Sequence, residues 1–283
     1  MCRPIIIIML TEPWMVRAFL AALLLAPLCA LLGVFVTARR MAFFSDTISH
    51  AGLTGVALGV WFGLADPTLP LIAVSLAVAA AIFWVKENTT LVTDSIMALL
   101  LSGSVAAGVI LLKLMNTRPG VLNGFLFGDI LAIGWREVWE AAGLCVVVVA
   151  GVFLKLSEIS LLTAHEEMAR VCGIRVRYLN YVSVVLLTLT VALTIRLLGI
   201  ILVTALLVIP PAAASNLSRN LRQQILLSTA AGLVGGLGGL GLAYQLNVPC
   251  GAAIVLMCIG LFVVTLVAGR FRAGSAPRPA RAR

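Results

Sequence analysis

Apolar runs of about twenty residues recur from one end of the chain to the other, and this repetition limits the fold more than any single motif does. A run of that length is what an α-helix needs to cross the hydrocarbon core of a bilayer. Hydrophobic residues make up 62% of the chain and charged residues only 11%, and the mean hydropathy is +1.14. These values lie outside the range of soluble domains. The sequence therefore predicts an all-α integral membrane protein.

The runs predict about nine transmembrane helices, or eight if a neighbouring pair is really one broken helix. The candidate spans cover residues 14–37, 46–64, 68–85, 92–113, 130–154, 178–196, 198–215, 224–244 and 250–269. No polar segment between them is long enough to form a soluble domain. We therefore expect residues 1–283 to form a single transmembrane domain with a basic tail at residues 270–283. The apolar run near the N-terminus is too short for a span and has no cleavage site of a signal peptide.

The net charge of +9 does not indicate a nucleic-acid partner, because the basic residues lie in short loops and in the tail. Such residues orient membrane helices by staying on the cytoplasmic side. With the tail inside, nine spans place fourteen of the twenty Lys and Arg residues in the cytoplasm. The six cysteines are scattered without a Cys-x-x-Cys motif, which argues against a disulfide framework and against a thiolate metal site.

Asp46 and His50 lie in a stretch with no other ionisable residue between Arg40 and Asp66. A separation of four residues puts both side chains on one face of a helix. A carboxylate inside a bilayer costs about 2.5 to 3.5 kcal/mol on insertion scales, so such a residue indicates a functional site. A carboxylate and an imidazole are also suitable ligands for Zn²⁺ or Mn²⁺.

A structural interpretation of the same pair also stands. Asp46 follows Arg40 by only six residues, so it could be an interfacial residue favoured by the helix dipole. His50 could be a hydrogen-bonded packing residue. Two local ligands are in any case fewer than a metal site needs.

The longest polar interruption, residues 155–177, predicts a short amphipathic helix on the cytoplasmic side. The polar and apolar faces of this helix are given by Glu166, Glu167 and Ala169, and the helix ends at Gly173. A helix presented in this way is a docking surface for a soluble partner, although an ordinary charged loop is the alternative.

Pro210 and Pro211 lie inside an apolar run and predict a kinked or broken helix. A break within a membrane is tolerated where the freed carbonyls line a cavity or are buried in protein. The nearby glycines predict close helix packing instead of a nucleotide loop; they are Gly232, Gly235, Gly236, Gly238, Gly239 and Gly241. The chain has no P-loop, so ATP binding by that motif requires a partner.

Three blocks then carry a resemblance to a known family, and they cover residues 39–59, residues 93–98 with 126–131, and a third block from 164 through 173 and 206–210 to 249–252. In this order the blocks resemble the permeases of bacterial ABC importers for zinc, manganese and iron(II), often called the ABC-3 family. The resemblance extends over residues 12–268. Ser45 stands where many members have Gly, and Pro211 adds a second proline to the usual one.

The resemblance implies a type II ABC importer permease, which is a transport subunit and not an enzyme, in a bacterial inner membrane. It implies a homodimer with a path near the interface, two cytoplasmic P-loop ATPase subunits and an extracytoplasmic metal-binding protein. Asp46 and His50 match positions that meet the metal, and residues Glu166, Glu167, Met168, Ala169 and Gly173 match the segment that couples to the ATPase. No cofactor is bound covalently, and the transported ion is the ligand.

We therefore expect a permease for a divalent transition metal, with zinc favoured over manganese and iron(II). Two rivals remain: a proton-coupled secondary metal transporter and a permease for a metal chelate such as a siderophore. The first would need more intramembrane carboxylates than the interior of this chain offers beyond Asp46. The Asp-x-x-x-His block argues against the second.

Overall fold

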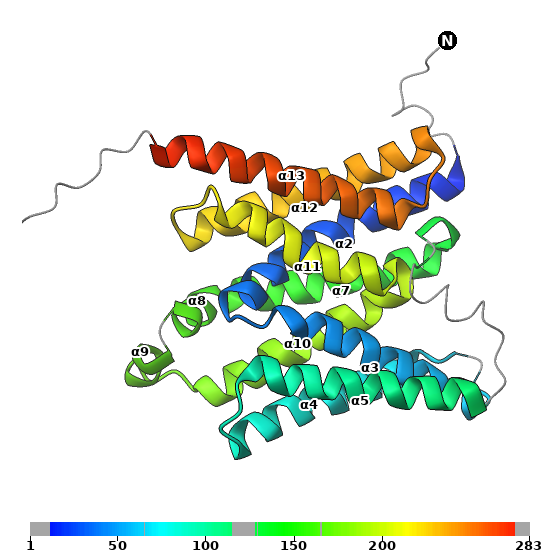
Figure 1. The fold of residues 1–283 in the computed structure, drawn as a ribbon, viewed down its shortest axis with the longest axis horizontal. Coiled ribbons are helices and arrows are strands. Elements are labelled where there is room, and N and C mark those ends of the chain that lie inside the picture. The colour runs from blue at the N-terminus through cyan, green and yellow to red at the C-terminus, as the bar shows by residue number, and fades with distance from the viewer. Residues whose placement is uncertain (1–11, 65, 115–127, 129, 165, 275–283) are drawn as a thin grey trace, which may run out of the picture.

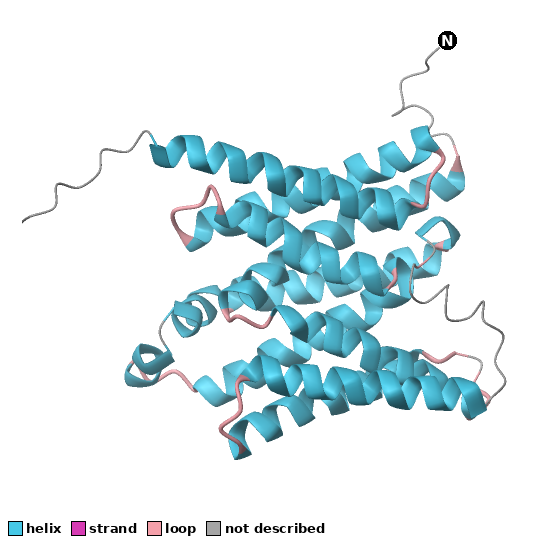
Figure 2. Ribbon diagram, in the orientation of Figure 1, coloured by secondary structure: helices cyan, strands magenta, loops and turns pink. Residues whose placement is uncertain are grey.

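The fold is taken from a computed structural model that describes residues 12–64, 66–114, 128, 130–164 and 166–274. Its elements are α2 (Pro13–Ala38), α3 (Ala42–Trp61), α4 (Thr68–Asn88), α5 (Thr93–Leu114), the 3-10 turn η1 (Ile130–Ala132), α7 (Trp135–Leu154), α8 (Leu156–Ala164), α9 (Glu166–Val171), α10 (Val176–Leu198), α11 (Ile200–Ser215), α12 (Leu221–Leu246) and α13 (Cys250–Gly274). Figure 2 shows that the described residues form helices and loops without a strand.

Each of the nine predicted spans coincides with one of these helices, so the all-α membrane architecture is confirmed. Seven of the described helices are long and apolar enough to cross a membrane. The other two are α11, which is a shorter apolar helix, and α3, which is long enough but more polar than the other seven. That polarity comes from the Asp46 and His50 turns and from buried Ser and Thr residues.

The helices run alongside one another across Figure 1, with α12 and α13 at one edge and α4 and α5 at the other. Between these edges, α2 packs against α11, α12 and α7, and α10 packs against α4 and α3. Nearly all of the second half of α2 is buried, whereas α5 and α13 expose most of their apolar side chains. The apolar outer surface is what a protein surrounded by lipid requires.

Glycines on α12 allow this helix to approach α2 closely, as the sequence predicts. A Cβ atom at Gly232 would lie 2.6 Å from the Cβ of Ala30, and one at Gly236 would lie 2.7 Å from the Cβ of Ala26. Ser228 donates a hydrogen bond of 2.8 Å from its hydroxyl to the backbone oxygen of Ala30. Small residues and hydroxyl-to-carbonyl bonds hold helices together in a membrane, where water cannot drive their association.

Pro210 and Pro211 do not interrupt α11, which continues as one α-helix to Ser215. The predicted break is therefore wrong, and the packing of α2 gives a reason. Pro211 cannot donate a hydrogen bond to the carbonyl of Leu207, its partner in a regular helix. Gly33 of α2 lies directly against that carbonyl oxygen, and a Cβ at Gly33 would overlap it and come 2.7 Å from the Cγ of Pro211. The weakened turn is thus enclosed by a neighbouring helix.

We predict that Gly33→Ala lowers the thermal stability of the purified protein in detergent. The added methyl group has no room, and overpacking of this kind costs about 1 to 3 kcal/mol. Gly143→Ala on α7 is the matched control, because no atom lies within 4 Å of a Cβ built there. Alanine favours a helix over glycine by about 1 kcal/mol, so the control should be neutral or stabilising. Equal destabilisation by both changes would contradict this packing.

Candidate functional site

The helix that carries Asp46 and His50 begins after a tight turn at the end of α2. Arg40 in this turn adopts a left-handed backbone conformation with φ of 55°, and the backbone N–H of Met41 donates to the carbonyl of Val36. Arg39 extends across to α10, where its Nη1 donates a hydrogen bond of 3.1 Å to Oδ1 of Asn180. The first turn of α3 is therefore fixed relative to both α2 and α10.

Two threonines attach α3 to α5. Thr47 donates its hydroxyl to the carbonyl of Met97 at 3.2 Å, and Thr54 donates to the carbonyl of Ser104 at 2.7 Å. The partners are seven residues apart on both helices, so α3 and α5 run in the same direction with a fixed register. Thr47 is fully buried and Thr54 nearly so.

A second face of α3 packs against α4 through residues that lack a Cβ atom. A Cβ at Gly55 would lie 2.6 Å from the carbonyl oxygen of Pro70, and one at Gly59 would lie 2.9 Å from the Cβ of Pro67. These positions cannot accept a larger side chain unless α4 moves. Together, α4 and α5 cover two sides of α3.

Asp46 and His50 remain partly exposed although most of α3 is buried. The spacing of four residues thus places both on one face, as predicted. The Nδ1 atom of His50 is buried and has no hydrogen-bond partner among the described residues. A buried polar atom without a partner costs about 1 to 3 kcal/mol, and a ligand would satisfy it.

The pair does not make a complete metal site by itself. Among the described residues no group of three or more His, Cys, Asp and Glu side chains is placed to hold a metal ion. Structural zinc sites have four protein ligands and catalytic ones usually three. An ion at Asp46 and His50 would therefore need water, backbone oxygens or another chain to complete its coordination.

The segment predicted to couple to an ATPase, residues 164–173, contains the short helix α9, and the separate helix α8 precedes it and ends at Ala164. Ala169 is completely buried and anchors α9, whereas Glu167 is exposed and the side chain of Met168 is 57% exposed. The side chain of Glu166 lies outside the described residues. Gly173 has a φ of 77°, a conformation that favours glycine, and it turns the chain toward α10.

An open cavity of about 390 Å³ lies beside α9 at the same end of the molecule. It lies between the start of α8 and the start of α10, and its lining includes Lys155, Glu158, Arg175 and Tyr178. The Nζ of Lys155 forms an ion pair with Glu158 at 2.6 Å. This end of the protein therefore presents a charged hollow next to an exposed short helix.

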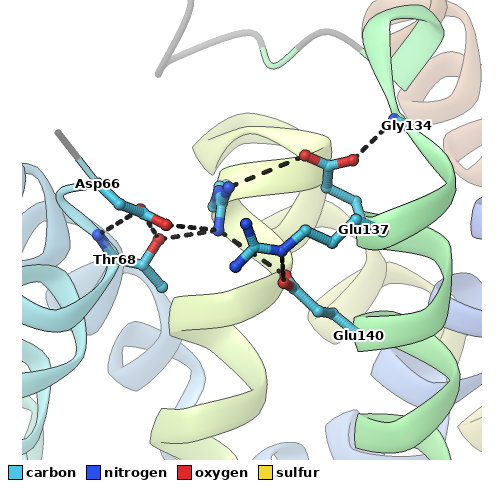
Figure 3. Close-up of polar contacts among 7 residues, drawn as sticks. Asp66, Thr68, Gly134, Glu137 and Glu140 are labelled. Carbon is cyan, nitrogen blue, oxygen red and sulfur yellow. Dashed lines mark hydrogen bonds and ion pairs between the residues drawn. The ribbon is translucent and has the colours of Figure 1, made fainter.

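A polar network at the opposite end, shown in Figure 3, was not predicted from the sequence. Arg196 in the last turn of α10 donates from Nη1 to the hydroxyl of Thr68 at 2.8 Å. The same guanidinium lies 3.8 to 3.9 Å from carboxylate oxygens of Asp66, Glu137 and Glu140. The position of Arg196 inside an apolar run indicates that it needs acidic partners. Which residues they are depends on the fold.

Asp66 is the carboxylate of this network on the loop before α4. Two hydrogen bonds from Thr68, through its hydroxyl and its backbone N–H, lower the pKa of Asp66, and the charge of Arg196 adds to this effect. Hydrogen bonds to a carboxylate favour its charged form. Asp66 is therefore negatively charged at neutral pH and pairs with Arg196 in that form.

Three comparisons with known proteins agree on one kind of molecule. Residues 11–269 match the model of the ABC 3 transport family. The High-affinity zinc uptake system membrane protein ZnuB of Haemophilus influenzae is 31% identical over 251 residues, which are 88% of this chain and 95% of that protein. The Manganese transport system membrane protein MntC of Halalkalibacterium halodurans is 30% identical over 256 residues, covering 90% of this chain and 87% of that protein.

A solved structure shares both the fold and part of the sequence. It is described as PsaBC from Streptococcus pneumoniae in complex with Fab, and one of its chains superimposes on this chain with a TM-score of 0.82 at 28% identity. The match covers 92% of this chain and 94% of that chain. The likeness thus spans the whole membrane domain.

We predict that Thr54→Val loosens the attachment of α3 to α5. The change preserves the shape of the side chain and removes one interhelical hydrogen bond, worth about 0.6 to 1 kcal/mol in proteins of this kind. Thermal unfolding in detergent measures the loss. Ser102→Ala is the control, because this exposed hydroxyl bonds only to Ala98 of its own helix. An equal loss of thermal stability in the control would show that the hydrogen bond between α3 and α5 stabilises the protein no more than a bond within one helix.

Proposed function

This chain belongs to the ABC 3 transport family and is a membrane permease of an ABC metal importer, and we propose that its main substrate is the zinc ion. Like its relatives it is a transport subunit and not an enzyme. Manganese and iron(II) are the competing substrates, because a histidine and a carboxylate suit all three ions. The relative named for zinc uptake supports zinc, and the relative named for manganese transport keeps manganese in the comparison.

The observation that carries the site assignment is the His50 Nδ1 atom, which is buried, unpartnered and on the same face as Asp46. In this proposal Asp46 and His50 contact the ion during its passage. Two protein ligands hold a divalent ion weakly, and weak binding suits a transport path, which must release what it admits. The remaining ligands come from water, from backbone oxygens or from a second copy of the chain.

The proposed assembly is a homodimer, in which the second copy can supply ligands that the pair lacks. In the proposed assembly two copies lie side by side in the bacterial inner membrane, with the path near their interface. An extracytoplasmic binding protein delivers the ion to it. In this proposal separate cytoplasmic ATPase subunits supply the energy, since the sequence has no P-loop of its own.

The proposed contact with the ATPase is the short helix α9. Ala169 fixes it to the body of the permease, while Glu167, Met168 and the exposed side chain of Val171 face outward. Gly173 then connects this surface to α10 through a tight turn. Movement of the ATPase against α9 would therefore reach α10 through this turn and α8 through direct packing.

We predict that Asp46→Asn and His50→Ala each lower zinc uptake by about tenfold or more, which corresponds to the loss of about 1.4 kcal/mol of interaction with the ion in transit. The assay uses the complete transporter with its ATPase and binding protein in proteoliposomes, with radioactive zinc as the tracer. Competition by unlabelled zinc, manganese and iron(II) ranks the substrates.

Asp94→Asn is the matched control, since Asp94 is an exposed carboxylate in the first turn of α5. It removes the same charge outside the proposed path and should leave uptake unchanged. Normal uptake by the Asp46 and His50 variants at equal abundance would remove the site assignment. Uptake that follows a proton gradient without the ATPase would overturn the proposed mechanism.

A further inference from the structure

Helix α10 connects the segment next to the ATPase with the opposite surface of the membrane domain. It starts at Val176, three residues after Gly173, and Arg196 lies in its last turn. Its 23 residues span about 35 Å at 1.5 Å per residue. A force that displaces the start of α10 therefore acts on one end of a continuous helix.

Helix α4 accompanies α10 in the opposite direction along its whole length. At the cytoplasmic end Arg177 forms an ion pair of 2.6 Å with Glu87, and the ring of Tyr181 lies 5.6 Å from that of Phe83. Further along, Ala192 and Leu71 belong to one buried cluster with Val56 of α3, and at the outer end Arg196 bonds to Thr68. Moving forward along α10 by a given number of residues moves the contact back along α4 by the same number. The two antiparallel helices therefore keep one register along their length.

The polar ties between α4 and α10 in the described structure are at the ends of the pair. In the middle, the register brings Ser75 and Thr188 to the same level, and both are fully buried with hydroxyls that have no hydrogen-bond partner. Apolar and small side chains fill the remaining contact. The hydrogen bond and ion pair that join the two helices are therefore at their ends, whereas packing alone joins their middles.

Arg196 is the stronger of the two end contacts. Its side chain is only 29% exposed, whereas that of Arg177 at the other end is 75% exposed and its ion pair is accordingly weak. Arg196 also reaches two carboxylates of α7, Glu137 and Glu140. Glu137 in turn accepts a hydrogen bond of 2.8 Å from the backbone N–H of Gly134, which fixes it at the start of α7. One guanidinium thus joins the outer ends of α4, α7 and α10 (Figure 3).

We propose that Arg196 is a positioning residue for transport, which clamps the outer end of α10 to α4 and α7 so that displacement of α10 by the ATPase reaches the outer surface. This inference rests on the proposed function of α9 as the ATPase contact. Arg196 does not touch the ion. Without the clamp, α10 moves at its cytoplasmic end while the outer ends of α4 and α7 stay behind.

The neighbouring Arg136 is a control that distinguishes this positioning role from the loss of one positive charge. It belongs to the same acidic cluster and pairs with Glu140 at 3.0 Å, but that pair lies within α7 and its arginine side chain is 77% exposed. Removing either arginine makes the outer surface more negative by one charge and would attract cations equally. Of these two arginines, only Arg196 joins α10 to α4.

The experiment measures zinc ions transported per ATP hydrolysed by the complete transporter in proteoliposomes, for Arg196→Gln and Arg136→Gln. Loss of one allosteric coupling contact should lower this ratio by about fivefold in Arg196→Gln. The exposed pair of Arg136 should change it by less than about twofold. Arg196→Lys keeps the charge and should restore part of the ratio. If Arg196→Gln does not accumulate, Thr68→Val removes the 2.8 Å hydrogen bond from Arg196, together with the bond from the same hydroxyl to Asp66, and should lower the ratio in the same direction.

An unchanged ratio in Arg196→Gln, or an equal change in both arginine variants, would overturn the clamp. A wild-type transporter that moves no metal would instead overturn the proposed function, so the two failures are distinguishable.

A second experiment tests whether α4 and α10 move as one body. Cysteines at positions 87 and 177 replace the exposed ion pair, in a background where the exposed Cys172 is changed to serine. A short thiol cross-linker should then leave zinc transport intact. Transport that stops on cross-linking would show that the two helices slide past each other and would contradict the clamp.

Discussion

The close packing of α3 against α4 and α5 determines which side chains of α3 remain accessible to a ligand. In a bilayer, polar groups must find partners inside the protein, and α3 satisfies its threonines on the backbone carbonyls of α5. Its glycines meet the backbone of α4 at the prolines that begin that helix. These contacts leave the face of Asp46 and His50 partly open, and they leave a buried nitrogen of His50 without a partner. The proposed transport site is a consequence of this packing.

In the proposed mechanism the energy for transport enters at the α9–α10 connection. Ala169 anchors α9 and Gly173 turns the chain into α10, so the surface proposed for the ATPase is continuous with a long helix. That helix shares one register with α4, and α4 in turn packs on the glycine face of α3. Helix α3, the segment α9 proposed to contact the ATPase, and the polar network around Arg196 are therefore connected through helices in direct contact.

The sequence predicted the positions of nine helices, because apolar runs are a local feature, and it predicted the common face of Asp46 and His50 from their spacing of four residues. It predicted the glycine seam of α12 for the same reason. It was wrong about a break at Pro210 and Pro211, since Gly33, which encloses that turn, lies far away in the sequence. The partners of Arg196 were also missed, because they lie on separate helices and only the fold brings them together. The second motif block includes residues 126, 127 and 129, and the tail includes residues 275–283; both lie partly outside the described residues.

The most direct test of the central claim is the X-ray absorption spectrum of zinc bound to the purified permease complex. The account predicts scattering from imidazole with a Zn–N distance of about 2.0 to 2.1 Å together with oxygen ligands, and it predicts that the imidazole component disappears in His50→Ala. A spectrum without imidazole, or one that the His50 change leaves as it was, would contradict the claim that the ion meets this face of α3.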